Sequence, residues 1–508
     1  MKILMFMGTR LRARLEYWLG ATAERAFRFA ASAALGLALM PLTADATISS
    51  VTVNTSRDYE NAPGYTFAEI TLKGYVARAD GTIGQYSVPA EIIFPEPHRS
   101  NRVGVVDWIN SAFYHFFPPT TEDATFQFTR LATGNYLFEE GYTYVSIQWN
   151  KAVTVIFGPT VPNDGKDHNP MLYGSIARSA DAWEILLDAA RLLKDPSAYP
   201  ANHAPVRVAT VLSSGYSQGA ALQLEMLAER RDPARIYDGH LIQMIGLACF
   251  KREDVPPNYG FFGDCGPLPS GGDHAPVISL VSESDMTIYH PTVLGFGKSA
   301  FFLRNTGDPN WRHYELAGVS HLPATILPLG VANQNNSDPR PAFRAAFKNL
   351  KRWTHGRNRH APPPSLFFEG GVDADDRFIL ESDIDGHFAG GMRLPHVFSL
   401  VHGHEAGAPL GLNAPLNPAG LDPFHPFIFI GGTFTRLSDD AIVQRYKTRR
   451  EYVARVQRAT SDLAVKGYIT MKDRKALVLR AREEPLPLVT GSHDECGEDE
   501  EEDDDGND

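Results

Sequence analysis

The chain has 508 residues, of which 43% are hydrophobic and 21% charged, the composition of a soluble globular protein. This balance excludes a disordered chain, a collagen and a polytopic membrane protein. Eleven of the fifteen residues from Asp494 to Asp508 are acidic and none is basic, so this tail carries nearly all of the net charge of −12. The rest of the chain is close to neutral, which gives no electrostatic reason to expect nucleic acid as a partner.

Residues 1–46 are predicted to be an export signal. Cationic residues precede an apolar stretch, Phe29–Leu42, and Ala44-Asp45-Ala46 then fits the small-x-small rule of a signal peptidase site. The apolar stretch is 14 residues long. A bilayer-spanning helix needs roughly 20, so we expect no permanent membrane span. The mature protein would begin near Thr47 and be periplasmic or secreted, and an amphipathic N-terminal helix is the alternative.

Residues 47–360 are predicted to form one α/β core. Runs rich in β-branched residues alternate with runs of helical spacing, and this repetition indicates a mostly parallel sheet flanked by helices. The expected strands are Val103–Trp108, Tyr142–Gln148, Val206–Leu212, Leu241–Ala248 and Val277–Val281. The expected helices are Ala177–Leu193, Gly219–Arg231 and Ala342–Trp353.

Three further segments differ in composition from this core. Residues 249–275 are rich in Pro and Gly and are predicted to be a cap-like loop. Residues 361–482 are predicted to be a C-terminal extension packed on the core, and residues 483–508 a disordered acidic tail. The helices expected in the extension are Ser438–Lys466 and Lys472–Arg482. Cys249 and Cys265 bracket the Pro- and Gly-rich loop and are either bridged or two unrelated thiols.

The central motif is Gly215-Tyr216-Ser217-Gln218-Gly219, which follows a predicted strand and precedes a predicted helix. In that setting G-x-S-x-G indicates a nucleophile elbow, a strained turn that presents a serine hydroxyl above the sheet. Side chains two residues either side of the serine would collide with the neighbouring strand and helix, and Gly215 and Gly219 remove them. A structural turn with an ordinary serine is the alternative.

A serine hydroxyl is a weak nucleophile, so it needs a base to take its proton and an acid to orient that base. In a fold with this elbow the chain order is Ser, acid, His. Asp285 is the predicted acid because it follows the strand Val277–Val281 at the edge of the sheet, and Glu283 is the rival beside it. His321, which lies past the next strand-like run, is the predicted base, whereas His313 lies inside that run.

The oxyanion formed in acyl transfer needs preorganised N–H donors. The elbow supplies the backbone N–H of Gln218 at the start of a helix, and the loop after Val103–Trp108 is predicted to supply a second, from Ser111 or its neighbour. The residues predicted to contact substrate are Asn110, Tyr114, Tyr216 and Phe261. The aromatic side chains favour an apolar pocket for acyl, alkyl or aryl esters, although they could equally belong to the core.

Several segments, in matching order over roughly residues 50–480, resemble the bacterial alpha/beta hydrolase domain family. They are Val105–Asn110, Tyr173-Gly174-Ser175, Tyr237-Asp238-Gly239, Ser282–Asp285, Ala317–His321 and Gly390–Pro395. The resemblance implies the alpha/beta-hydrolase fold and a serine hydrolase of the carboxylesterase type, with Ser217, His321 and either Asp285 or Glu283 carried over by position. It does not imply a particular substrate. Gly219 and Ala220 after Gln218 depart from the family pattern.

Other classes of function remain as alternatives. His402-Gly403-His404 has the spacing of metal ligands but no third ligand near it in sequence, so we expect no metal and no cofactor. A non-catalytic binding protein on the same scaffold is possible in principle because fold does not dictate function. Within hydrolases, a carboxylic ester is the expected small-molecule substrate, and lactones, thioesters and amides are the alternatives because the same machinery cleaves them.

Overall fold

The computed structural model describes the chain from residue 46 to residue 487, with internal gaps. The gaps are 78–81, 110–126, 150–152, 158–178, 246–267, 289–302, 305–306, 330–331, 356–359, 373–377, 384, 398, 402–403 and 415–430. Residues 1–45 of the predicted export signal, residues 488–508 of the acidic tail, all three cysteines and most of the cap-like loop therefore lie outside the described residues. Predictions that concern them stay predictions. The tail boundary predicted at residue 483 was wrong, because the last helix extends to Glu483 and residues 484–487 are described.

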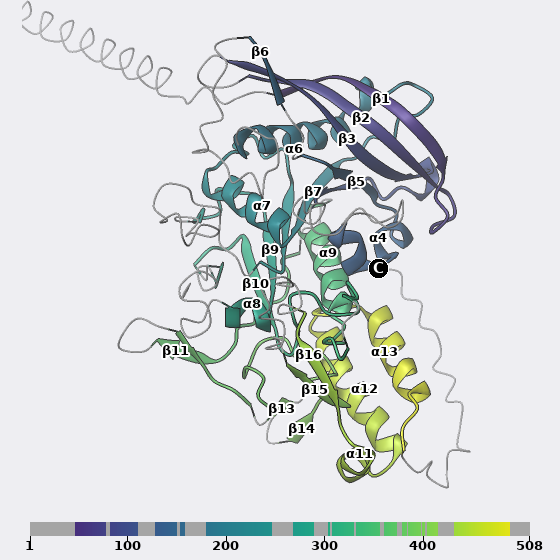
Figure 1. Ribbon diagram of the computed structural model, residues 1–508, viewed down its shortest axis with the longest axis vertical. Helices are drawn as coiled ribbons and strands as arrows, with labels where there is room; N and C mark the ends of the chain where they lie inside the picture. Colours follow the sequence, from purple (N-terminus) through teal and green to yellow (C-terminus); the bar gives the residue numbers. More distant parts are fainter. Residues whose placement is uncertain are drawn as a thin grey trace, which may run out of the picture.

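A single ten-stranded sheet runs through the molecule (Figure 1). Its main path follows the order β1-β2-β3-β5-β4-β7-β8-β9-β10, and β6 pairs with β3 at one side. The strands from β5 to β10 along this path are parallel to one another. Their bounds are β4 Val103–Trp108, β5 Thr143–Ile147, β7 Thr210–Tyr216, β8 Gly239–Gln243, β9 Val277–Ser282 and β10 Trp311–Leu316. The predicted α/β fold class is confirmed.

Three long antiparallel strands precede the parallel part and were not predicted. They are β1 Ala46–Asp58, β2 Tyr65–Ala77 and β3 Ile83–Pro95, and the short β6 Val153–Phe157 is antiparallel to β3. Along β3, buried residues alternate with more exposed ones for most of its length. Such period-two alternation belongs to a sheet that covers the core on one face only. The continuous apolar runs that identified the parallel strands are therefore absent from β1 to β3.

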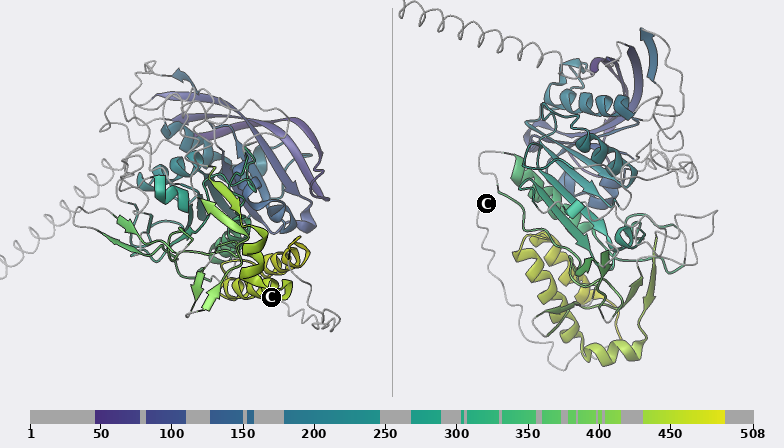
Figure 2. Two further views of the ribbon diagram at one scale, coloured as in Figure 1. Left: turned by 60° about the horizontal axis from the view of Figure 1, so that its bottom comes forward. Right: turned by 90° about the vertical axis from the view of Figure 1, so that its left-hand side faces the viewer.

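Helices cover both faces of the parallel strands (Figure 1 and Figure 2). Adjacent residues of β4 illustrate the two sides, since Val105 packs into one apolar cluster and Val106 into the other. One cluster includes α6 Ser179–Lys194 and α7 Gln218–Ala228, and the other includes α3 Phe128–Thr133, α4 Tyr136–Glu139 and α9 Arg340–Thr354. The short helices are η1 Pro97–Arg99, η2 Pro196–Ala198 and α8 Glu283–Ile288.

Two predicted bounds at the elbow were wrong, and their correction matters for the site. The strand expected at Val206–Leu212 is β7 Thr210–Tyr216, and the helix expected at Gly219–Arg231 is α7, which begins at Gln218. Only Ser217 separates the two elements. The chain before Thr210 forms no strand, whereas Ser213, Ser214 and Gly215 are fully paired with β4 despite their small or polar side chains.

In the residues that the structure describes, the C-terminal extension contains three two-stranded ribbons followed by three helices, at the opposite end of the molecule from β1 (Figure 1). The ribbons are β11 Gly370–Val372 with β12 Phe378–Leu380, β13 Ser399–Val401 with β14 His404–Ala406, and β15 Gly411–Ala414 with β16 Thr433–Arg436. The helices are α11 Asp439–Tyr446, α12 Arg449–Val465 and α13 Met471–Glu483.

Each of these three helices begins at a capping hydroxyl. Ser438, Thr448 and Thr470 accept hydrogen bonds from backbone N–H groups three residues later, at 3.2, 3.2 and 3.0 Å. The single helix predicted at Ser438–Lys466 is therefore wrong, because the chain breaks at Lys447, whose φ is 54°. Thr448 then starts a new helix.

Candidate active site

The turn between β7 and α7 places Ser217 in a strained conformation. Ser217 has φ 54° and ψ −113°, a combination that side chains with a Cβ atom rarely adopt. Its N–H donates to the carbonyl of Gln243 on β8 at 2.9 Å, and its carbonyl accepts from Ala221 at 3.0 Å. The neighbouring strand and the new helix together hold the strained residue, so the hydroxyl has a fixed position at the carboxyl edge of the sheet.

The two glycines of the motif lie where backbones meet. A Cβ atom on Gly219 would lie 1.7 Å from the carbonyl oxygen of Trp108 at the end of β4, and one on Gly215 would lie 2.6 Å from the carbonyl carbon of Gly219. Real Cβ contacts stay above 3.0 Å. Both positions require glycine because of this close approach, which sets the distance between α7 and the sheet.

Three predicted residues meet at this edge. His321 Nε2 lies 2.9 Å from Ser217 Oγ, and His321 Nδ1 lies 2.6 Å from Asp285 Oδ1. The histidine is 4% exposed and the aspartate 1%, so both are shielded from water. A hydroxyl, an imidazole and a carboxylate in this sequence can pass the hydroxyl proton to the imidazole while the carboxylate fixes the ring.

Asp285 is held by the turn that starts α8. Its Oδ2 accepts from the backbone N–H of Ser282 at 2.8 Å and from the Ser282 hydroxyl at 2.6 Å. Both donors belong to the last residue of β9, so the carboxylate is anchored to the sheet. Its other oxygen, Oδ1, is the one that contacts His321.

Glu283, the rival acid, is equally buried but is directed elsewhere. Its Oε2 accepts from the backbone N–H of Gly318 at 2.7 Å, and its Oε1 accepts from that of Phe388 at 3.1 Å. His387 Nδ1 lies 3.5 Å from the same carboxylate. Glu283 therefore links two segments, the loop that carries His321 and the C-terminal extension.

A match between this chain and a family model for the alpha/beta hydrolase domain extends over residues 95–479. This span is most of the chain. The protein belongs to the alpha/beta hydrolase domain family. The resemblance noted in the sequence is thereby confirmed, and the family match includes both the core and the C-terminal extension.

The chain is only weakly similar to solved structures. A methylesterase shares 11% identity, with 55% of each chain covered and a TM-score of 0.29. A glucuronoyl esterase from Teredinibacter turnerae shares 14%, covering 50% of this chain and 68% of the other, with a TM-score of 0.26. An acetyl xylan esterase from a Paenibacillus species shares 11%, with 53% and 82% covered and a TM-score of 0.30. The match spans about half the length of the methylesterase, and no curated protein matches the chain.

The loop that carries the histidine of this alpha/beta hydrolase is held on several sides. The backbone N–H of His321 donates to Ser284 Oγ at 2.6 Å, and its carbonyl accepts a hydrogen bond from the Tyr216 hydroxyl. Asn335 Nδ2 donates to the carbonyl of Gly318 at 3.1 Å. These contacts fix the backbone on both sides of the imidazole, so the ring has a defined position beside Ser217.

Tyr216 has a place in the hydrolase that differs from the one predicted. It was expected to contact substrate, but its side chain is 1% exposed and its hydroxyl donates to the His321 carbonyl. Burial raises the pKa of Tyr216 well above its usual range, which keeps the hydroxyl protonated as a donor. In the structure this side chain supports the histidine loop.

The remaining predicted site residues are only partly placed. Gln218 is the first residue of α7, so its backbone N–H lies at the helix start where a negative charge is favoured. Asn110, Ser111, Tyr114 and Phe261 lie outside the described residues. The second oxyanion donor and the substrate contacts of this hydrolase therefore stay predictions.

His313, the rival base, is in the interior of the hydrolase. Its side chain is fully buried in β10, where Nδ1 lies 2.7 Å from Ser279 Oγ and Nε2 lies 3.3 Å from Glu315 Oε1. Glu315 also receives two hydrogen bonds from Arg304, at 2.6 and 2.7 Å. His313 thus belongs to a buried charged network between β9 and β10.

A second buried network, which the sequence analysis did not identify, lies beneath the elbow. Asp107 on β4 accepts from the Tyr144 hydroxyl at 2.5 Å and from Thr129 Oγ1 at 2.7 Å. Thr129 lies 3.0 Å from Ser214 Oγ, which Gln243 contacts at 2.6 Å. Burial raises the pKa of Asp107 from 3.8 to about 7. The signal in the sequence was one acid inside an otherwise apolar strand, directly before the predicted oxyanion loop.

Within the described ranges, no group of three or more His, Cys, Asp or Glu side chains is placed to hold a metal ion. No helix in the part of the chain that the structure describes combines the length and apolarity needed to cross a membrane. His402 and Gly403 of the ligand-like tripeptide lie outside that part.

Proposed function

We propose that this alpha/beta hydrolase is an exported serine hydrolase that cleaves carboxylic esters through an acyl-enzyme intermediate. The observation that carries the proposal is the continuous path from Ser217 Oγ to His321 Nε2 at 2.9 Å and from His321 Nδ1 to Asp285 at 2.6 Å. The strained backbone at Ser217 supports it, because such strain persists where the surrounding structure enforces it and is concentrated at functional sites.

The proposed reaction has two halves. In the first, Ser217 Oγ attacks the ester carbonyl while His321 Nε2 takes the hydroxyl proton, and Asp285 stabilises the resulting imidazolium. The backbone N–H of Gln218 and one from Ser111 or its neighbour stabilise the oxyanion. His321 then returns the proton to the leaving alkoxide, and the acyl group stays on Ser217.

In the second half, His321 removes a proton from a water molecule that attacks the acyl-enzyme. The tetrahedral intermediate collapses, the proton returns to Ser217 Oγ, and the carboxylic acid leaves. Lactones, thioesters and amides would follow the same steps. We place esters first because the aromatic residues of the predicted pocket favour an apolar acyl, alkyl or aryl group.

An active-site-directed fluorophosphonate tests the nucleophile. We expect the wild-type protein to be labelled and Ser217→Ala not to be labelled. The matched control is Ser279→Ala, a buried serine on β9 that contacts His313 rather than His321. Absence of labelling in folded wild type would favour a non-catalytic binding protein, and equal labelling of Ser217→Ala would place the nucleophile elsewhere.

A panel of esters that differ in acyl and alcohol size, assayed beside lactones, thioesters and amides, tests the substrate class. We expect Ser217→Ala and His321→Ala each to lower kcat by several orders of magnitude, leaving a residual of roughly 10³- to 10⁴-fold over water. Activity that chelators abolish would contradict a metal-independent mechanism. For export, mass spectrometry of the protein from its native compartment should find an N-terminus near Thr47.

A further inference from the structure

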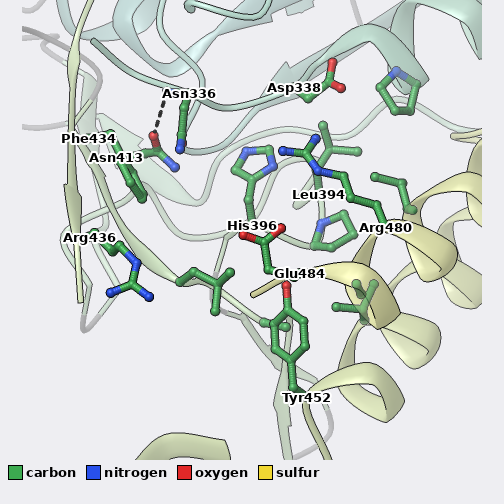
Figure 3. A pocket seen from close by; sticks show the side chains of 17 residues that line it. Asn336, Asp338, Leu394, His396, Asn413, Phe434, Arg436, Tyr452, Arg480 and Glu484 are labelled. Atoms are coloured by element: carbon green, nitrogen blue, oxygen red, sulfur yellow. Dashed lines mark hydrogen bonds between the residues drawn. The ribbon is translucent and has the colours of Figure 1, made fainter. Parts of the chain in front are cut away.

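A cavity of about 200 Å³ lies among the elements of the C-terminal extension and the segment before α9 (Figure 3). α12 and α13 form one wall, β15 and β16 the opposite wall, and residues 394–396 the floor between them. None of Ser217, Asp285 and His321 lines it. A dry cavity of about 150 Å³ admits a benzene molecule, so this one has room for a ligand with one ring or a branched aliphatic group.

Two opposite charges line the cavity without neutralising each other. Arg480 and Glu484 lie four residues apart near the end of α13, yet among the described residues neither forms an ion pair. The same spacing on α12 does produce ion pairs, Glu451 with Arg455 and Asp462 with Lys466, each at 2.9 Å. Glu484 is the first residue after α13, as Lys466 is the first after α12, and with φ −59° and ψ 126° the chain turns away from the helix axis only beyond it.

The other charged groups around the cavity are already compensated. Asp338 receives two hydrogen bonds from Arg340, both at 2.7 Å, and Arg436 pairs with Asp439 at 2.8 Å. Burial lowers the pKa of His396 to about 4, so its ring is neutral near pH 7. The charges left without a counter-ion among the described residues are Arg480, which is exposed, and Glu484, which is half-buried.

The rest of the lining would suit an apolar body with polar ends. Its apolar members are Pro341, Leu394, Pro395, Ala408, Leu410, Phe434, Val456, Leu477 and Ala481. Polar atoms lie among them: Asn413 is 3% exposed and accepts from the backbone N–H of Asn336 at 3.3 Å, and His396 Nε2 is buried without a hydrogen-bond partner among the described residues. The Tyr452 phenol is 6% exposed and lies in the field of both Glu484 and Arg480.

We propose that this cavity is a binding site for a small zwitterion with an apolar body, such as an amino acid with a large apolar side chain. The carboxylate of the ligand would pair with Arg480, its ammonium group with Glu484, and its side chain would pack against Leu394, Phe434 and Val456. A zwitterion offers a partner to both charges, whereas a simple anion offers one to Arg480 alone and a simple cation offers one to Glu484 alone. This site is independent of the proposed ester hydrolysis.

Three probes of one shape test the proposal by calorimetric titration of the full chain: L-phenylalanine, 3-phenylpropanoate, which lacks the amine, and 2-phenylethylamine, which lacks the carboxylate. We expect phenylalanine to bind at least about tenfold more tightly than either of the others, because each contributes one charge-assisted contact fewer. Absence of phenylalanine binding at millimolar concentration, or equal affinity for the three probes, would overturn the proposal.

Paired variants locate the contacts. Arg480→Gln should weaken the binding of phenylalanine and 3-phenylpropanoate about tenfold and leave the binding of 2-phenylethylamine unchanged. Glu484→Gln should weaken the binding of phenylalanine and 2-phenylethylamine about tenfold and leave the binding of 3-phenylpropanoate unchanged. The matched controls are Lys475→Gln and Glu483→Gln, which alter exposed charges of the same helix outside the cavity. Equal losses in the variants and in their controls would mean that the charges act at a distance, which contradicts the site.

Discussion

Replacement of Gly219 by alanine tests the physical basis of the elbow. Gly219 lies in the first turn of α7, where its backbone is helical, so intrinsic helix preference alone favours alanine by about 1 kcal/mol. The packing opposes this preference. The new Cβ atom would lie 1.7 Å from the carbonyl oxygen of Trp108, and real contacts of this kind stay above 3.0 Å. The first turn of α7 and the end of β4 must therefore separate by more than about 1 Å.

The size of the effect follows from that separation. Overpacking of this kind costs roughly 1–3 kcal/mol, and the obstacle is a backbone carbonyl that cannot rotate away as a side chain would. We expect Gly219→Ala to lower the free energy of unfolding by an amount in this range despite the helix preference. Because Ser217 lies two residues away, a shift of about 1 Å would lower the rate of acyl transfer on the order of 100-fold.

Urea denaturation measures the first effect, and the rate of fluorophosphonate labelling measures the second. Gly307→Ala is the matched control, because the added Cβ would meet no described atom within 4 Å. We expect this control to change stability by less than about 0.5 kcal/mol. If Gly219→Ala proved as stable as the wild type and were labelled equally fast, the close approach of helix and strand would not be what positions the nucleophile.

Three further predictions concern acids and the tail. Asp285→Asn should lower kcat by about 10⁴-fold, whereas Glu283→Gln should lower kcat less and reduce the free energy of unfolding by roughly 1–3 kcal/mol, since it loosens two buried N–H groups; steady-state kinetics and urea melts of both variants separate these effects. The folded state binds the Asp107 proton more tightly than the unfolded chain, so this carboxyl contributes stability that is present below about pH 4 and is lost as the pH rises to about 7. Asp107→Asn should remove that part of the pH dependence, which amounts to up to about 4 kcal/mol in the free energy of unfolding. Urea melts of both proteins at pH 4 and pH 8 measure it. If the assignment were wrong, the free energy of unfolding would change by the same amount between the two pH values in wild type and variant. Truncation after Leu488 should leave kcat and KM unchanged, because the removed charges repel one another and have no apolar surface to pack; loss of activity would contradict this.

The sequence located the elbow because the constraint there is local. Gly215 and Gly219 flank Ser217 within five residues, and the geometry that requires them involves the strand and helix on either side. The order of serine, acid and histidine along the chain also restricted the choice, since parallel strands bring their carboxyl ends to one edge. In the structure Ser217, His321 and Asp285 do meet at that edge.

The sequence favoured Asp285 over Glu283 but could not decide between them, because both follow β9 within one helical turn. Their separation depends on the direction in which each side chain leaves α8. Asp285 is turned back to Ser282 and across to His321, while Glu283 reaches Gly318 and Phe388. The Phe388 contact is made across 105 residues, and no local pattern contains that information.

Besides the contacts of Glu283, backbone hydrogen bonds also hold the core and the extension together at the site. The backbone N–H of Ala317 donates to the carbonyl of Met392 at 3.1 Å, and that of Met392 to the carbonyl of Glu315 at 2.7 Å, so the chain of the extension continues the edge of the sheet beside β10. Gly318 has φ 68°, and a Cβ atom there would lie 2.6 Å from Val397. The loop that carries His321 is thus packed between the two parts.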